Sequence, residues 1–275
     1  MTMVFWIILL FIVIGLFLKF YLFAGTKEPV LKKTDWKKDV VYLYQFKRNI
    51  HVPNLSPFCM KIETFMRANK ITYEVVEGNF TRSHKGLLPF IELNGEQIAD
   101  SEFIIYKLAE KFNVKENLPK ERAGSLRALS RMFDEEVFRI QLKYKIRSED
   151  AVRIMLADLP DFLIPLIHPI IRLFIGRRLS ASGYGAHSDE ELLQMYRRDL
   201  QATVDILGDN KFFGGDKLVM ADCVIYGQLA SLYLLPCDTL VHEVIRKEFP
   251  KLGKYVEDVT LEYYSEFPCA KKLMQ

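Results

Sequence analysis

The chain has 275 residues, of which 50% are apolar and 27% charged, so it is long enough for one large or two modest folded domains, and global disorder is excluded. Its formal net charge is +3, but residues 27–48 alone carry +4 and the residues after them about −2, so no broad basic face is expected for nucleic acid. No metal site is predicted, because the four cysteines form no CxxC motif or Cys/His cluster; they are Cys59, Cys223, Cys237 and Cys269.

The N-terminus is strongly apolar: residues 1–18 contain no charged side chain, and the run continues past Lys19 to Phe23. Because about 20 helical residues cross a hydrocarbon core of about 30 Å, residues 1–25 are predicted to be a transmembrane anchor. A signal peptide is the alternative, but the basic start and short apolar core typical of one are missing. The lysines of the basic linker, residues 26–39, predict that the folded body lies in the cytosol. The sequence does not distinguish between the lysosomal, mitochondrial outer and endoplasmic reticulum membranes.

The first folded unit is expected to span residues 40–114 and to combine strands with helices. Its strongest local signals are the Ser56-Pro57 helix start and the Asn94-Gly95 hairpin turn. The predicted elements are a strand at 39–46, a helix from Ser56-Pro57 onward, a strand at 71–76, a hairpin of strands 90–93 and 96–99, and a helix at 101–112.

This order, with a proline before the third strand, resembles the thioredoxin-like domain of glutathione transferases. The resemblance implies a cis Leu88-Pro89 bond and recognition of a peptide-like thiol by the backbone of Leu88. It also implies that Asp100 and Ser101 hold the γ-glutamyl end of glutathione, with the helix N-terminus attracting the carboxylate. The alternative for this pair is that it only caps the helix. Lys85, in the loop before Leu88, is expected to bind a carboxylate of glutathione; the alternative is that it is a solvated loop charge.

The SPFC motif is expected to handle the thiol. In glutaredoxin-like relatives the residue before the proline is a nucleophilic cysteine, whereas here it is Ser56. A serine hydroxyl can donate a hydrogen bond to the glutathione sulfur and favour its thiolate, so conjugation is more natural than mixed-disulfide chemistry. Cys59 lies at the position of a resolving cysteine. The alternative for the motif is a helix cap followed by an apolar Phe-Cys pair.

The second unit, residues 115–275, is predicted to be all-α. Helical patterns cover 120–150 and 189–208, and a last helix is expected at 257–266. Residues 159–175 are apolar but contain three prolines, and they are interpreted either as a wall of a hydrophobic substrate pocket or as a contact with the membrane surface. The stretch 212–230 resembles the C-terminal signature of the same family, with Val219 in place of the usual capping hydroxyl and Asp222 in a structural role.

The apolar N-terminus, SPFCMKIETFMR and KGLLPFIELNGEQIADSEFIIYKLAEKF together resemble the nematode cadmium-responsive and failed axon connections family, a glutathione S-transferase-like group related to metaxins. The fold class implied is α+β: a thioredoxin-like domain and an all-α domain after a transmembrane helix. The function implied is glutathione conjugation or reduction of hydrophobic electrophiles in stress, cadmium or xenobiotic detoxification, with a homodimer as a further expectation. A non-catalytic, metaxin-like adaptor in membrane organisation or axon development is the alternative.

Overall fold

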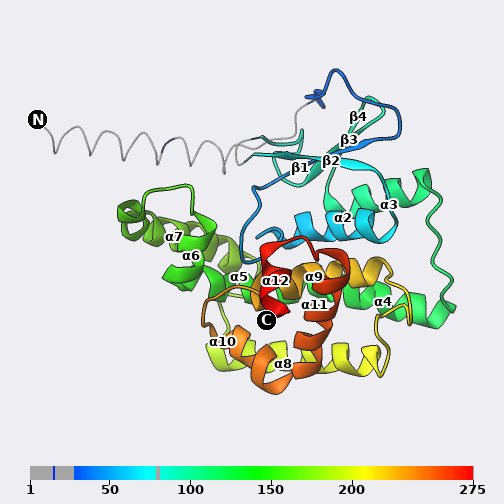
Figure 1. The fold of residues 1–275 in the computed structure, drawn as a ribbon. Helices are drawn as coiled ribbons and strands as arrows, with labels where there is room; N and C mark the ends of the chain where they lie inside the picture. The colour runs from blue at the N-terminus through cyan, green and yellow to red at the C-terminus, as the bar shows by residue number, and fades with distance from the viewer. Residues whose placement is uncertain (1–14, 16–27, 79–80, 275) are drawn as a thin grey trace, which may run out of the picture.

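The computed structural model describes residues 15, 28–78 and 81–274, which form a four-stranded sheet domain packed on a larger helical domain (Figure 1). The predicted anchor at residues 1–25 lies outside the described residues except for Gly15, so it stays a prediction. Within the described ranges, no helix combines the length and apolar character needed to cross a membrane.

The sheet confirms the predicted thioredoxin-like order. Its strands are β1 Val41–Gln45, β2 Tyr73–Glu77, β3 Phe90–Leu93 and β4 Glu96–Ala99, in the spatial order β2-β1-β3-β4. β1 pairs in parallel with β2 and antiparallel with β3, as expected when a helix connects the first pair and a hairpin connects β3 to β4. That helix is α2 Pro57–Ala68, and it lies with α3 Ser101–Lys111 between the sheet and the helical domain (Figure 1).

Residues 28–39, predicted as a linker, are bound to the outer face of the sheet. The carboxylate of Glu92 on β3 accepts hydrogen bonds from the backbone N–H groups of Lys32 (2.6 Å) and Lys33 (2.8 Å). The hydroxyl of Tyr44 donates to the same carboxylate (2.9 Å), and the side chain of Gln97 donates to the carbonyl of Val30 (2.8 Å). The folded unit therefore includes the chain from Val30 onward.

The helical domain surrounds one central helix, α9, whose sides are almost completely buried. Its elements are α4 Lys120–Met132, the π-helical turn η1 Phe133–Val137, α5 Phe138–Arg147, α6 Glu149–Met155, the 3-10 turn η2 Asp161–Leu163, α7 Ile164–Ala181, α8 Asp189–Leu207, α9 Met220–Tyr233, α10 Leu240–Glu243, the π-helical turn η3 Val244–Glu248, α11 Pro250–Tyr263 and α12 Pro268–Leu273.

The two domains meet where α2 crosses α9, and a glycine makes the close approach possible. A Cβ atom on Gly227 would lie only 2.6 Å from the carbonyl oxygen of Pro57. Further along α2, the hydroxyls of Thr64 and Tyr264 are 2.8 Å apart, which ties the same helix to the chain after α11. The N-terminal end of α2 is thus held by both domains.

Two helical predictions differ from the structure, and one segment without a predicted helix is helical. The helix expected at 120–150 is divided by η1 and ends at Arg147, after which the Ser148 side chain caps α6. The helix expected at 257–266 begins earlier, because Pro250 occupies a first-turn position where its missing N–H costs nothing. The proline-containing segment 159–175, for which no helix was predicted, contributes η2 and the first two-thirds of α7: Pro165 lies in the first turn, where its missing N–H costs nothing, and Pro169 lies inside the helix.

Candidate functional site

The register of the sheet brings separate predicted motifs to one edge. Phe90 pairs with Tyr44 on β1 and with Ala99 on β4, so the end of β1, the start of β3 and the end of β4 coincide. Pro89 and Asp100, the next residues along these strands, therefore lie at the same edge. The loop that leads into α2 starts there as well. The sheet thus gathers residues that are far apart in the sequence.

Ser56 is the N-cap of α2, as predicted. Its Oγ accepts a hydrogen bond from the backbone N–H of Cys59 (3.4 Å). The buried side chain of Asn54 fixes the approach to this cap: its Oδ1 accepts from the Ser56 N–H (3.0 Å), and its Nδ2 donates to the Phe46 carbonyl (2.8 Å). Asn54 was not predicted as a site residue, although an Asx turn before a Ser-Pro cap is a recognisable signal.

Cys59 faces the interior of the first domain and is completely buried. Burial raises the pKa of its thiol to about 12, outweighing the hydrogen bond from Ser56 that acts in the opposite direction. The thiolate that redox chemistry requires is therefore disfavoured at neutral pH. All four cysteines are buried, and none forms a disulfide.

The Leu88-Pro89 bond is cis, as the resemblance implied. The loop before it lies close to the Ser56 loop, because the guanidinium of Arg82 lies over the ring of Phe46 (5.3 Å), whose carbonyl binds Asn54. Arg82 was not predicted as a site residue, since a single arginine in a loop carries no sequence signal. It brings a fixed positive charge to this edge of the sheet.

The Asp100-Ser101 pair occupies the N-terminus of α3. Asp100 is the N-cap, and its Oδ1 accepts from the Glu102 N–H (2.9 Å). Its φ of 84° is unusual for a residue with a side chain, and such strain is concentrated at functional sites. Lys85 lies beside this helix end, with its ammonium group 4.9 Å from the centre of the Phe103 ring. A helix N-terminus and a nearby lysine together suit a carboxylate ligand.

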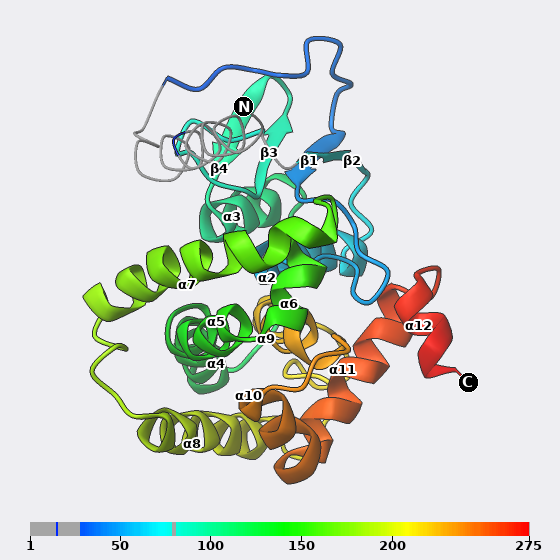
Figure 2. The same ribbon diagram turned by 90° about the vertical axis from the view of Figure 1, so that its left-hand side faces the viewer.

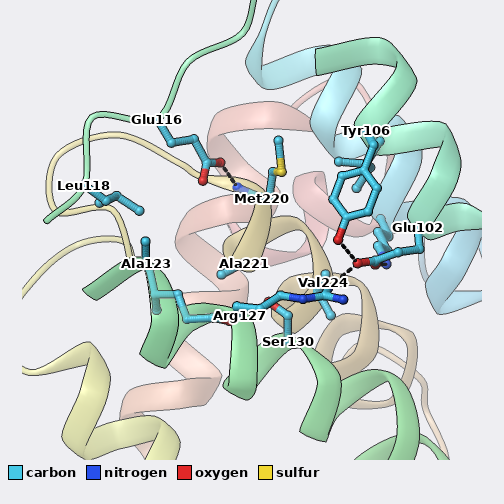
Figure 3. A pocket seen from close by; sticks show the side chains of 13 residues that line it. Glu102, Tyr106, Glu116, Leu118, Ala123, Arg127, Ser130, Met220, Ala221 and Val224 are labelled. Atoms are coloured by element: carbon cyan, nitrogen blue, oxygen red, sulfur yellow. Dashed lines mark hydrogen bonds and ion pairs between the residues drawn. The ribbon is translucent and has the colours of Figure 1, made fainter. Parts of the chain in front are cut away.

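A pocket of about 190 Å³ opens next to this helix end, between α3, α4 and α9 (Figure 3). Lys61 lines it and is almost completely buried, with its ammonium group paired to Glu102 (3.0 Å) and Asp134 (2.8 Å). Figure 3 shows Tyr106 and Arg127 both reaching the Glu102 carboxylate. Burial alone would raise the pKa of Glu102, but these partners lower it to about 2. The helix that carries Ser101 is thereby anchored to the helical domain.

An apolar surface from both domains lies next to Ser56. The ring of Phe58 in α2 packs edge-on against Phe138 in α5, with 4.9 Å between their centres. Nearby, Lys47 forms an ion pair with Asp158 (2.9 Å), which joins the Ser56 loop to the segment before α7. The described residues contain no group of three His, Cys, Asp or Glu side chains that could hold a metal ion.

Solved structures define the class of fold. A glutathione S-transferase of Ceriporiopsis subvermispora, crystallised in complex with glutathione, matches 82% of this chain and 98% of its own with a TM-score of 0.58 and 16% identity. At that identity the match shows the fold alone. It is the fold of glutathione S-transferases, with a thioredoxin-like sheet and a helical C-terminal domain.

Family models support the same class at the level of sequence. A glutathione S-transferase N-terminal domain model matches residues 57–151, and a glutathione S-transferase C-terminal domain model matches residues 196–259. Together they cover more than half of the chain, which belongs to the glutathione S-transferase family.

Three curated relatives are consistent with this placement and confirm the resemblance predicted from the sequence. Failed axon connections of Drosophila melanogaster is 34% identical over 222 residues, covering 75% of this chain. The match spans only 53% of the Drosophila protein, about half its length. An isoprene-epoxide–glutathione S-transferase of Rhodococcus is 25% identical over 77% of this chain and 94% of its own. A metaxin-1 homologue of Caenorhabditis briggsae is 34% identical over 79 residues, covering 29% of this chain and 25% of its own.

Proposed function

We propose that this chain binds glutathione at the sheet edge formed by Ser56, Leu88-Pro89 and Asp100-Ser101. The observation that carries the proposal is the strand register, which places the ends of β1 and β4 and the start of β3 together. Each motif alone is compatible with ordinary capping or turn formation. Their convergence supports a site for one extended, peptide-like ligand.

Each part of glutathione has a suitable partner at this edge. The γ-glutamyl carboxylate suits the N-terminus of α3 with Ser101, and the γ-glutamyl amine suits the carboxylate of Asp100. The cysteinyl backbone suits the peptide groups of Leu88, which precede the cis proline. Lys85, beside the start of α3, adds positive charge for the γ-glutamyl carboxylate, and Arg82, beside Phe46, supplies it for the glycyl carboxylate.

The chemistry that Ser56 supports is thiolate stabilisation. Its hydroxyl, at the N-terminus of α2, donates a hydrogen bond to the glutathione sulfur and lowers the pKa of that thiol. The thiolate then attacks an electrophilic carbon, forming a C–S bond as a leaving group departs or an epoxide ring opens. Phe58 and Phe138 provide an apolar surface for the electrophile. The similarity to an isoprene-epoxide–glutathione S-transferase supports this reaction class.

The cellular role we propose is detoxification at a membrane, including the response to cadmium. Residues 1–25 would anchor the chain, and the lysines after them would keep the folded part in the cytosol. Glutathione chemistry is the proposed route to the cadmium response, since it needs no protein-bound metal. A homodimer, as expected from the resemblance, belongs to the same proposal.

A non-catalytic adaptor is the second candidate. It is supported by the similarity to a metaxin-1 homologue over 79 residues and to failed axon connections over 222 residues. The buried Cys59 adds support, because its raised thiol pKa disfavours the thiolate that a redox enzyme on this fold would need. In this case the same fold would act through protein contacts alone.

Kinetics with a hydrophobic epoxide and glutathione separate the two candidates. If the chain is a transferase, Ser56→Ala should lower kcat about 100-fold, the usual effect of removing one stabilising donor, with little change in glutathione affinity. Ser125→Ala is the matched control, because this exposed serine in α4 donates only to the carbonyl of Glu121. Wild-type protein that binds glutathione but turns over no faster than Ser56→Ala would favour the adaptor.

A further inference from the structure

Helix α7 and the segment that leads into it, from the end of α6 through η2, present apolar side chains to solvent. Of the exposed large apolar side chains in the described part of the chain, five of fourteen lie between residues 155 and 173. The most exposed are Phe162 (67%), Leu166 (54%) and Leu173 (51%). Figure 2 shows α7 along the outside of the helical domain, on the side that faces the viewer. Clustered exposure of this kind marks an interaction surface more often than scattered single residues do.

This face is distinct from the face that packs against the protein. Residues 166, 169 and 173 recur at helical spacing along the exposed side of α7, and Phe162 in η2 precedes them at the same spacing. The opposite side is already satisfied: Ile171 and Leu179 are buried in a cluster with Ile146 and Val152 of α5 and α6, and His168 binds the Ile146 carbonyl (2.8 Å). The helix is thus apolar on both sides, although only one is covered by the described chain.

Three arginines accompany the exposed apolar face. Arg172, Arg177 and Arg178 are exposed, and α7 contains no acidic residue. In the described ranges, none of their guanidinium groups forms an ion pair, whereas the exposed Arg147 and Arg197 each bind a carboxylate at 2.7 Å. The exposed surface of α7 therefore combines an apolar side with positive charge, carried by Arg177 near that side and by Arg172 and Arg178 towards its flanks, that the described chain leaves uncompensated.

We propose that this face of α7 lies on the surface of a lipid bilayer that contains anionic headgroups. Phe162, Leu166 and Leu173 enter the boundary between headgroups and acyl chains, and the arginines bind lipid phosphates. Charge complementarity favours this occupant over a second copy of the chain, because two such faces related by a two-fold axis would bring like charges together. The uncharged run at residues 1–18 points to the same kind of surface, but the inference does not depend on it, nor on the glutathione site.

The test measures how deeply α7 enters lipid in the full-length chain. Leu166→Cys is labelled with an environment-sensitive fluorophore, which is selective because the native cysteines are buried. Gln201→Cys on α8 is the matched control, because Gln201 is exposed too. Any membrane attachment through the N-terminus would affect the two labelled proteins equally. Each protein is reconstituted in phosphatidylcholine vesicles with or without phosphatidylserine, and quenching by brominated acyl chains is recorded.

The label at position 166 should shift to the blue and be quenched several-fold more with phosphatidylserine than without it. Changing Arg172, Arg177 and Arg178 together to Glu should remove that difference while the circular dichroism spectrum is retained. The label at position 201 should stay in water throughout. The proposal is overturned if the two labels are equally exposed in anionic vesicles. It is also overturned if the label at 166 becomes shielded with rising protein concentration in the absence of lipid, which would indicate a second copy.

Discussion

At the scale of single residues, the buried charges of α2 are the least expected feature. Lys61 pairs with Glu102 at the start of α3 and with Asp134 in η1, so one ammonium group joins three elements and both domains. On the sequence, Lys61 is only one of several charged residues between apolar helix positions. Lys61 is buried because α2 packs between the sheet and the helical domain. A local sequence pattern cannot predict that packing.

Replacing Lys61 with Met should destabilise the fold by about 3–5 kcal/mol, the usual effect of leaving buried charges without their partner. Lys115→Met is the control, because Lys115 is exposed and makes no ion pair within the described ranges; its effect should stay within about 0.5 kcal/mol. Urea unfolding followed by circular dichroism measures both. Equal midpoints for the two variants would show that the cluster does not stabilise the protein.

The same cluster predicts a dependence of stability on pH. Because the pKa of Glu102 is about 2 in the folded chain, below its ordinary value of 4.5, its contribution is fully present above pH 4.5. It is lost as the pH falls from 4.5 to about 2. Urea midpoints measured across this range should fall more steeply for wild-type protein than for Glu102→Gln. Parallel curves for the two proteins would show that protonation of Glu102 does not cause the loss of stability at low pH.

At the scale of elements, the crossing of α2 and α9 determines where Ser56 lies. The hairpin strands were predicted to the residue and the first two strands to within two residues at each end, because β-branched and aromatic runs and the Asn94-Gly95 turn are local signals. The start of α11 and the helix α7 were not predicted. Pro165 and Pro250 indicate a helix break until they are known to lie in a first turn, and Pro169 lies inside α7 despite its missing N–H. The role of Asn54 was missed as well: its contact with the Ser56 N–H is a local Asx turn, but its contact with the Phe46 carbonyl depends on where the loop folds back.

Gly227→Ala should destabilise the protein by about 1–3 kcal/mol, because the new Cβ would meet the Pro57 carbonyl at 2.6 Å and force the two helices apart. Gly124→Ala in α4 is the matched control: a Cβ there meets no atom within 4 Å, and a gain of about 0.5–1 kcal/mol is expected from helix propensity. Thermal unfolding compares them. A Gly227→Ala protein as stable as Gly124→Ala would mean that the crossing is not tight.

At the scale of the whole molecule, the two-domain architecture followed from the order of motifs. Pro89, the Asn94-Gly95 turn and Asp100-Ser101 occur in the order of one fold, so the sheet edge could be predicted before any distance was known. The partners that surround this edge could not, because Arg82 reaches it from a loop and Arg127 reaches Glu102 from the second domain. The central claim is that this edge binds glutathione.

Isothermal titration calorimetry of the full-length chain with glutathione tests that claim most directly. We expect saturable binding at millimolar or lower glutathione, weakened about tenfold (about 1.4 kcal/mol) in Ser101→Ala and unchanged in the control Ser125→Ala. Folded wild-type protein that releases no heat of binding at millimolar glutathione, or a Ser101→Ala protein that binds as tightly as wild type, would contradict it.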